Sequence, residues 1–182
     1  MGLLHTYAAD VVWTGAGETG TTGYAAYRRD HEVRVAGKPT IAGSADPAFR
    51  GDPARHNPEE LLVSALAQCH MLWFLHLAAT AGVVVVAYTD RATGTMRVEA
   101  AGHGQFTEAV LRPHVTVRRG PVDAGRATDA TGAPGPGTDD LDLDASLADL
   151  HRQAHEHCFI ARSVSFPVRT EPAPVAVEQP SA

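Results

Sequence analysis

Two cysteines are the residues of this sequence that could do chemistry most directly. Cys69 lies within an apolar segment and is followed by His70, whereas Cys158 ends a polar segment and is preceded by His157. In a cytosolic protein such a pair is more often a redox or metal pair than a structural disulfide. Free cysteine is also a common small hydrophobic residue of protein cores, so simple packing is the alternative interpretation.

Four histidines near the cysteines make a metal site a second interpretation. His151 and His155 are four residues apart, which places them on one face of a helix. With His70, His157 and the cysteines they could form a zinc site, because zinc favours nitrogen and sulfur ligands. Two alternatives stay open: the histidines are solvated positions on a half-exposed helix, or His70 or His157 tunes a nearby thiol.

The helix that carries Cys69 is delimited at both ends by the sequence. Asn57 suits the N-cap, Pro58 suits the first helical position, and Glu60 can complete a capping box. The helix is expected to run to about residue 81 and to stop at Gly82, which is a good C-terminal cap.

This helix is apolar on almost every face from Leu61 to Leu77, which predicts burial all round. A chain of 182 residues has difficulty covering such a helix alone, so we expect an oligomer. The apolar run from 71 to 86 is interrupted by His76 and Thr80 and falls short of the roughly 18 residues that a membrane span needs. No membrane association is therefore expected.

The remaining elements predict an α+β fold in which antiparallel sheets accompany the helices. We expect one domain over residues 1–170, with a flexible insertion at 120–141 and a disordered tail at 171–182. A second helix is predicted at 145–159 with Asp144 as its cap, and a long surface loop at 38–56. Strands are predicted at 5–14, 24–35, 83–88, 95–101, 105–119 and 163–169, with a meander in the middle of the chain.

Charge and composition restrict the functional class. The net charge is −6 with the histidines neutral, and there is no basic stripe, so nucleic acid is not an expected partner. The first residues lack the basic and apolar regions of a signal peptide. We therefore expect a cytoplasmic protein.

The two cysteine segments resemble those of the OsmC/Ohr family, the osmotically inducible proteins and organic hydroperoxide resistance proteins. The segment 57–62, Asn-Pro-Glu-Glu-Leu-Leu, with Cys69 ten residues after Glu59, is similar to the helix start and reactive cysteine of that family. Cys158, followed by Ala-Arg-Ser-Val at 161–164, is similar to its second cysteine. The resemblance covers about residues 5–170.

The resemblance implies a fold of antiparallel sheets wrapped around long central helices in an intertwined homodimer. It also implies a thiol peroxidase of organic hydroperoxides, in which Cys69 attacks the peroxide and Cys158 resolves the product as a disulfide. The family needs no bound cofactor; an external dithiol, such as a dihydrolipoyl group, resets the enzyme. An arginine would lower the thiol pKa and hold the peroxide, and Glu59 would hold that arginine.

The identity of this arginine is open, because the first loop of the chain has none. The segment 27–32, Tyr-Arg-Arg-Asp-His-Glu, resembles a strand motif in one branch of the family and points to Arg29. Strand alternation would place Arg29 and His31 on one face, with Arg28 on the other. Arg28, Arg34 and Arg50 are the other candidates, and a solvated strand face is the alternative interpretation.

The spacing of Glu59 and Cys69 supports a site shared between two chains. Ten helical residues rise about 15 Å and rotate through about 1000°, so the two side chains of one helix do not meet. If Glu59 serves a Cys69, that cysteine is expected to belong to the partner chain.

Two functions compete with the peroxidase. One is an OsmC-like protein that binds a metal or small molecule through Cys and His, and the other is a stress-associated relative without efficient catalysis. Trp73, Phe74 and Phe159 are expected in the core, but they could also wall an apolar pocket for the organic part of a peroxide.

Overall fold

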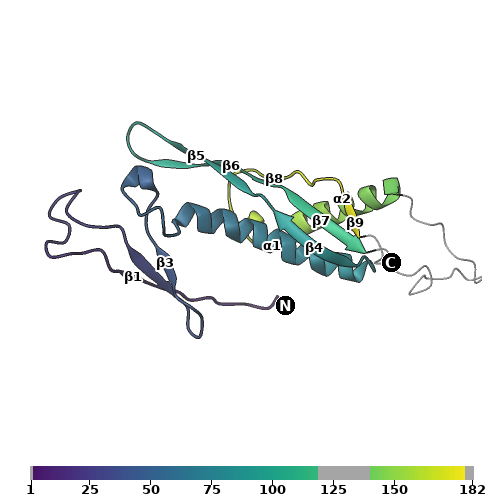
Figure 1. Cartoon of the computed structure of the whole chain (residues 1–182), viewed down its shortest axis with the longest axis horizontal. Helices are drawn as coiled ribbons and strands as arrows, with labels where there is room; N and C mark the ends of the chain where they lie inside the picture. Colours follow the sequence, from purple (N-terminus) through teal and green to yellow (C-terminus); the bar gives the residue numbers. More distant parts are fainter. Residues whose placement is uncertain (1, 119–139, 179–182) are drawn as a thin grey trace, which may run out of the picture. The chain divides into compact units, whose positions relative to one another are not determined.

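The computed structural model describes residues 2–118 and 140–178 (Figure 1), and these form two compact units that divide between Leu62 and Val63. Helix α1 (Pro58–Thr80) begins in the first unit and continues into the second. The division into two compact units does not test whether residues 1–170 form a single domain, so the single domain stays a prediction.

The first unit is built on a three-stranded antiparallel sheet with the order β1–β2–β3. Its elements are β1 (Asp10–Trp13), β2 (His31–Arg34), β3 (Ile41–Gly43) and the 3-10 helix η1 (Pro47–Phe49). The strands predicted at 5–14 and 24–35 are thus much shorter than expected, and the predicted loop at 38–56 contains β3 and η1. The chain before β2 instead turns back on Gly15, whose carbonyl accepts a hydrogen bond from the Arg28 amide at 2.8 Å.

The start and end of α1 agree with the sequence prediction. The Glu60 amide donates to Asn57 Oδ1 at 2.8 Å, and the Asn57 amide donates to Glu60 Oε2 at 3.2 Å, which is the predicted capping box. Gly82 follows the helix with φ of 74°, a left-handed conformation that favours glycine.

Within a single chain, α1 is less buried than its apolar sequence predicted. Its buried residues form one stripe at four-residue spacing: Leu66, His70, Phe74 and Ala78. Leu72 is 62% exposed, so much of the apolar surface is not covered by the chain's own elements. The structure of a single chain does not test the predicted oligomer, which stays a prediction.

Helix α1 also meets the length and hydropathy criterion for a membrane span, although the sequence predicted no membrane association. By length and composition alone, α1 could cross a membrane, because His76 and Thr80 do not offset its apolar residues. Apolar core helices of soluble proteins meet the same criterion, so the finding is weak evidence for a membrane protein.

The second unit contains two three-stranded sheets. One has the order β4–β7–β9, with β4 (Val85–Asp90), β7 (Pro113–Arg118) and β9 (Ala176–Glu178). The other has the order β5–β6–β8, with β5 (Thr93–Val98), β6 (Gly104–Leu111) and β8 (Val168–Thr170). The strand predicted at 105–119 is therefore two strands in different sheets, which part at Arg112 before Pro113.

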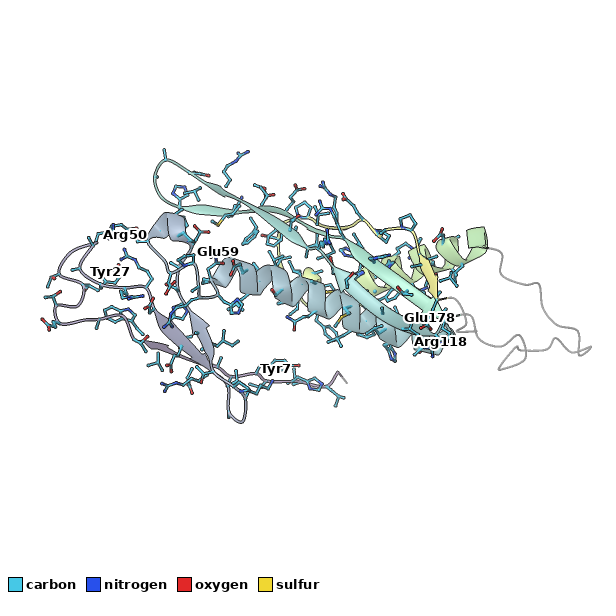
Figure 2. All side chains as sticks on the ribbon, in the orientation of Figure 1. Tyr7, Tyr27, Arg50, Glu59, Arg118 and Glu178 are labelled. Carbon is cyan, nitrogen blue, oxygen red and sulfur yellow. The ribbon has the colours of Figure 1, made fainter. Side chains whose placement is uncertain are left out.

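The tail predicted to be disordered at 171–182 is ordered up to residue 178. The amides of Glu171 and Ala173 donate to the carbonyls of Leu111 and Pro113, and β9 then pairs in parallel with β7. Prolines alternate with these donors, so they occupy positions that need no N–H. Arg118 of β7 and Glu178 of β9 form an ion pair (Figure 2). Residues 179–182 lie outside the described residues.

The second helix, α2 (Asp140–His157), begins earlier than predicted. Asp144 is not its cap but lies within the helix, where its carboxylate accepts a hydrogen bond from the Val175 amide at 3.1 Å. The end of the insertion predicted at 120–141 is thus helical, and its other residues lie outside the described ones.

The main core of the second unit lies between the two helices and the β4–β7–β9 sheet. Its buried members are Phe74, Ala78, Val115, Val117, Leu147, Leu150 and Ala154. A smaller cluster of Leu66, Ala109 and Leu111 packs α1 against β6. The α+β class and the long helix are confirmed, and together they bring the middle of α1 to the end of α2.

Candidate active site

The two cysteines lie together in the second unit. Cys69 is half-buried on α1, and Cys158, which directly follows α2, is 1% exposed. Both thiols are free, and Cys69 lies close enough to Cys158 to influence the pKa of its thiol. Cys158 Sγ also accepts a hydrogen bond from the Ala161 amide at 3.4 Å.

The environment of Cys158 favours the protonated thiol over the thiolate. Burial, and then the hydrogen bond and charge of Cys69, raise the pKa of the Cys158 thiol to about 11, although the Ala161 amide acts in the opposite direction. Because the thiolate is the nucleophilic form, Cys158 is not a reactive nucleophile at neutral pH. This suits a residue that reacts only after its neighbour has been oxidised.

Two further pairs of side chains join the same elements. His70 Nε2 lies 3.0 Å from His151 Nδ1, and the His151 ring stacks on Phe74 with a centroid distance of 4.1 Å. Trp73 stacks on His157 at 4.9 Å. With the cysteines these residues form a group that we call the thiol cluster: Cys69, His70, Trp73, His151, His157 and Cys158.

The aromatic edge of the thiol cluster is partly open to solvent. Trp73 also contacts Phe159 edge-on at 5.5 Å, and Phe159 is 66% exposed. Phe74 is fully buried, as expected for a core residue. Trp73 and Phe159 therefore offer an apolar surface beside Cys158 for an organic group.

The predicted zinc ligands are not arranged as a metal site. Within residues 2–118 and 140–178, no group of three or more His, Cys, Asp or Glu side chains is placed to hold a metal ion. His70 and His151 bond each other, and His157 lies against Trp73. Three of the four histidines thus contact other side chains of the fold, whereas His155 Nδ1 is buried without a hydrogen-bond partner among the described residues.

Glu59 and Arg29 line one open pocket of the first unit, of about 340 Å³. Its aromatic walls are Trp13, Tyr27 and Phe49. Glu59 Oε2 is buried there without a hydrogen-bond partner among the described residues. We call this the Glu59 pocket; Figure 2 labels Glu59 and Tyr27.

Arg29 is already engaged by its own loop. Its guanidinium donates to the carbonyls of Tyr27 and Tyr24 at 2.8 and 2.9 Å. It also lies over both tyrosine rings, 4.2 and 4.4 Å from their centroids. No ion pair between Arg29 and Glu59 is formed in the part of the chain that the structure describes.

The other candidate arginines do not line the Glu59 pocket. Arg28 pairs with Asp30 at 2.8 Å, and Arg34 pairs with Glu32 at 2.6 Å. Arg29 and His31 both line the pocket, but strand alternation does not account for this, because Arg29 lies before β2 rather than within it.

Comparison with known proteins identifies the family. The family model described as OsmC-like protein matches residues 51–132. The structure of an OsmC-like protein of unknown function from Vibrio cholerae is 32% identical, covers 93% of this chain and 100% of its own, and has a TM-score of 0.71. The chain belongs to the OsmC/Ohr family.

Two more distant structures share the OsmC/Ohr fold. Organic hydroperoxide resistance proteins from Legionella pneumophila and Elizabethkingia anophelis are each 15% identical, with TM-scores of 0.60. Both matches cover 97% of this chain. They cover 100% of the Legionella protein and 98% of the Elizabethkingia protein. Among curated proteins nothing matches. Family membership thus indicates a redox role.

Of the site residues predicted in this OsmC/Ohr chain, the structure brings together two pairs. Cys69 and Cys158 meet in the second unit, and Arg29 and Glu59 line a pocket of the first. The sequence reasoning missed the bond between His70 and His151. Their positions beside Cys69 and on the Cys158 helix were visible, but their pairing depends on how α1 and α2 pack.

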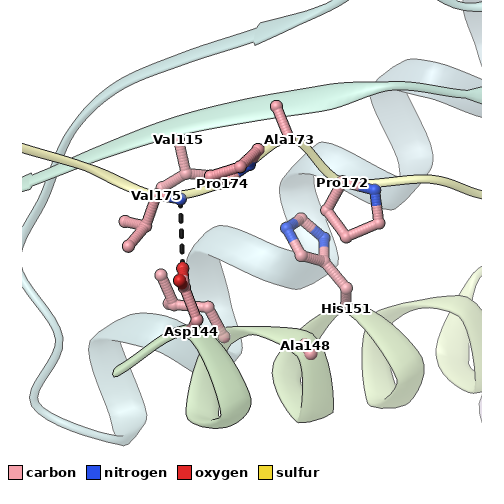
Figure 3. Close-up of a pocket in the computed structure, with 9 residues that line it drawn as sticks. Val115, Asp144, Ala148, His151, Pro172, Ala173, Pro174 and Val175 are labelled. Atoms are coloured by element: carbon pink, nitrogen blue, oxygen red, sulfur yellow. Dashed lines mark hydrogen bonds between the residues drawn. The ribbon is translucent and has the colours of Figure 1, made fainter. Parts of the chain in front are cut away.

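A second pocket, of about 240 Å³, shares His151 with the thiol cluster (Figure 3). It lies between α2 and the segment 172–175, and His151 and Asp144 supply its polar groups. His151 therefore has one side toward the core and one toward this pocket.

Proposed function

We propose that the protein is a thiol-dependent peroxidase of organic hydroperoxides, with Cys69 as the attacking residue and Cys158 as the resolving one. The proximity of Cys69 to the buried Cys158 is the observation that carries the proposal. Membership of a family that includes hydroperoxide resistance proteins supports it.

The first step would oxidise Cys69. Its thiolate attacks one oxygen of the peroxide, the O–O bond breaks, and the products are a sulfenic acid and an alkoxide that takes up a proton. The apolar surface of Trp73 and Phe159 would favour an organic substituent over hydrogen peroxide.

The second step would form a disulfide. Cys158 attacks the sulfur of the sulfenic acid, an S–S bond forms, and hydroxide leaves with the Cys158 proton as water. An external dithiol, for which a dihydrolipoyl group is the candidate, then reduces the disulfide by thiol exchange and is itself oxidised. No bound cofactor is required.

Glu59 and Arg29 are proposed to serve a thiolate rather than to react. A cation near Cys69 would lower its pKa, and the unpartnered Glu59 carboxylate is suited to hold a cation. We propose a cytoplasmic homodimer in which Glu59 of one chain serves Cys69 of the other, which would also cover the exposed apolar surface of α1.

An OsmC-like binding protein without efficient peroxidase activity is the second candidate. The engagement of the Arg29 guanidinium by two carbonyls and two tyrosine rings favours it, because such an arginine is less available to a thiolate.

Turnover of tert-butyl hydroperoxide and of hydrogen peroxide with dihydrolipoamide tests the proposal. The wild type should consume the organic peroxide faster, and Cys69→Ser should not turn it over. No turnover with any dithiol, together with slow alkylation of Cys69, would contradict the peroxidase and favour the binding protein.

A further inference from the structure

One side-chain hydrogen bond joins α1 to α2 among the described residues, and it lies between His70 and His151. The two side chains come from positions 81 residues apart and are 0% and 4% exposed. His70 directly follows Cys69, and His151 precedes Cys158 by seven residues, or about two helical turns. The bond thus ties together the two helices that bring Cys69 and Cys158 near each other.

The protonation of this histidine pair follows from its surroundings. Burial lowers the pKa of both rings to about 4, with the nearby His155 contributing at His70 and His70 contributing at His151. Both rings are therefore neutral at pH 7, and each carries one N–H. His70 Nδ1 is buried without a partner among the described residues.

The unpartnered nitrogen indicates which ring donates. A buried N–H group without an acceptor costs more than a buried acceptor nitrogen without a donor. The unpartnered Nδ1 of His70 is therefore the acceptor nitrogen, and the His70 proton lies on Nε2, which donates to His151 Nδ1. The His151 proton is then on Nε2, and His151 is one of the residues that line the pocket in Figure 3.

Packing alone does not explain a polar pair in this core. Apolar residues of similar volume would fill the space between α1, α2 and Phe74 without the cost of burying four ring nitrogens. A hydrogen bond adds direction, because it holds only over a narrow range of distance and angle. A slip of one residue along a helix moves a side chain by about 1.5 Å and 100°, which would break this bond and separate the thiols.

We propose that His70 and His151 are positioning residues that hold α1 and α2 in the register at which Cys69 and Cys158 can form a disulfide. This inference rests on the thiol chemistry of the proposed function. It assigns the pair no contact with peroxide.

The equilibrium of the thiols with glutathione at pH 7 tests the proposal without peroxide. In that reaction, oxidised glutathione accepts the two electrons of Cys69 and Cys158, and the products are the protein disulfide and two reduced glutathiones. His70→Leu and His151→Leu should each lower the equilibrium constant roughly tenfold, which raises the reduction potential by about 30 mV. The double variant should lose no more than either single one, because the same bond is removed.

Two further variants separate positioning from general stability. His70→Gln can place an amide N–H near the position of Nε2, so it should retain most of the equilibrium constant, whereas the shorter His70→Asn should not. Val117→Ala removes apolar volume from the same core on β7 and should leave the potential unchanged. If the leucine variants do not fold, the comparison of Gln with Asn decides.

Each outcome has a distinct meaning. Equal constants for the wild type and the histidine variants, or an equal loss in Val117→Ala, would overturn the positioning role. A glutathione response that depends on the histidines in a protein that consumes no peroxide would sink the peroxidase but keep the inference. Absence of any Cys69–Cys158 disulfide in the wild type would overturn the inference as well.

Discussion

The thiol cluster and the Glu59 pocket differ in how completely they are assembled. In the thiol cluster the side chains pair with one another: Cys69 lies near Cys158, His70 bonds His151, and His157 stacks on Trp73, although His70 Nδ1 has no partner among the described residues. In the Glu59 pocket the carboxylate has an oxygen without a partner among the described residues, and the arginine is satisfied by its own loop.

This difference separates two requirements of thiol peroxidase chemistry. Forming a disulfide needs two sulfurs close together, and one unit of a single chain places Cys69 near Cys158. Activating the first thiol needs a nearby cation, and among the described residues the candidate Arg29 is engaged by its own loop and forms no ion pair with Glu59. The contrast suggests that disulfide formation is set by the fold of the chain, whereas activation depends on a further rearrangement or a second chain.

The largest expected effect is in the thiol cluster. Cys69→Ser should lower peroxide turnover at least about 1000-fold, because a hydroxyl at neutral pH is a far weaker nucleophile than a thiolate. Cys158→Ser should still consume one equivalent of peroxide and then stop with a sulfenic acid on Cys69. Stopped-flow kinetics with a sulfenic acid probe would check both, and equal activity of the two variants would contradict the assigned roles.

The next effect is the pH dependence of stability. His70 and His151 have a pKa of about 4 in the folded protein and about 6.5 when unfolded. The unfolded chain therefore binds protons first, and the stability is fully present above pH 6.5 and lost as the pH falls to 4. Because a tenfold change in a binding constant corresponds to about 1.4 kcal/mol, the pair should lose roughly 3 kcal/mol or more over this range.

Urea unfolding at several pH values between 7 and 4 would measure this loss. The control is the double variant His70→Leu/His151→Leu, in which the slope over this range should be much smaller. An equal slope in the double variant would show that the pair is not the cause.

A smaller effect is expected in the Glu59 pocket. Glu59→Gln and Arg29→Gln should each lower kcat/KM for the organic peroxide roughly tenfold, within the range for one charge-assisted contact. Arg34→Gln is the matched control, because Arg34 pairs with Glu32 and does not line the pocket. Equal rates for Arg29→Gln and Arg34→Gln would exclude Arg29 as the activating cation.

The smallest effect should come from a salt bridge outside both sites. Arg169 of β8 pairs with Glu108 of β6 at 2.7 Å, and both side chains are partly exposed. Such pairs contribute roughly 0.2–1 kcal/mol, so Arg169→Gln should lower the free energy of unfolding by no more than that. Thermal unfolding would measure it, and peroxide turnover should be unchanged.

Local signals explain how far the sequence could predict the fold. Asn57, Glu60 and Gly82 fix the ends of α1 through contacts within a few residues, and these ends were predicted correctly. The tail at 171–178 was predicted wrongly, because its order comes from carbonyls of Leu111 and Pro113, which are distant in the sequence. Alanines and prolines in a terminal segment do not reveal such a partner.

The same distinction applies to the candidate site. The family motif led to Cys69, Cys158 and Glu59, and the structure places the two cysteines near each other. The bond between His70 and His151 joins distant positions, so no spacing rule could find it. The engagement of Arg29 by tyrosine carbonyls was equally hidden, because the sequence predicted a strand where the chain forms turns.

The most direct test of the account is a single oxidation without reductant. Reduced protein would receive one equivalent of tert-butyl hydroperoxide, and its peptides would then be mapped by mass spectrometry without reduction. The account predicts a disulfide between Cys69 and Cys158 of the same chain, formed in step with release of tert-butanol. Two free thiols beside unreacted peroxide, or a disulfide between two chains, would contradict it.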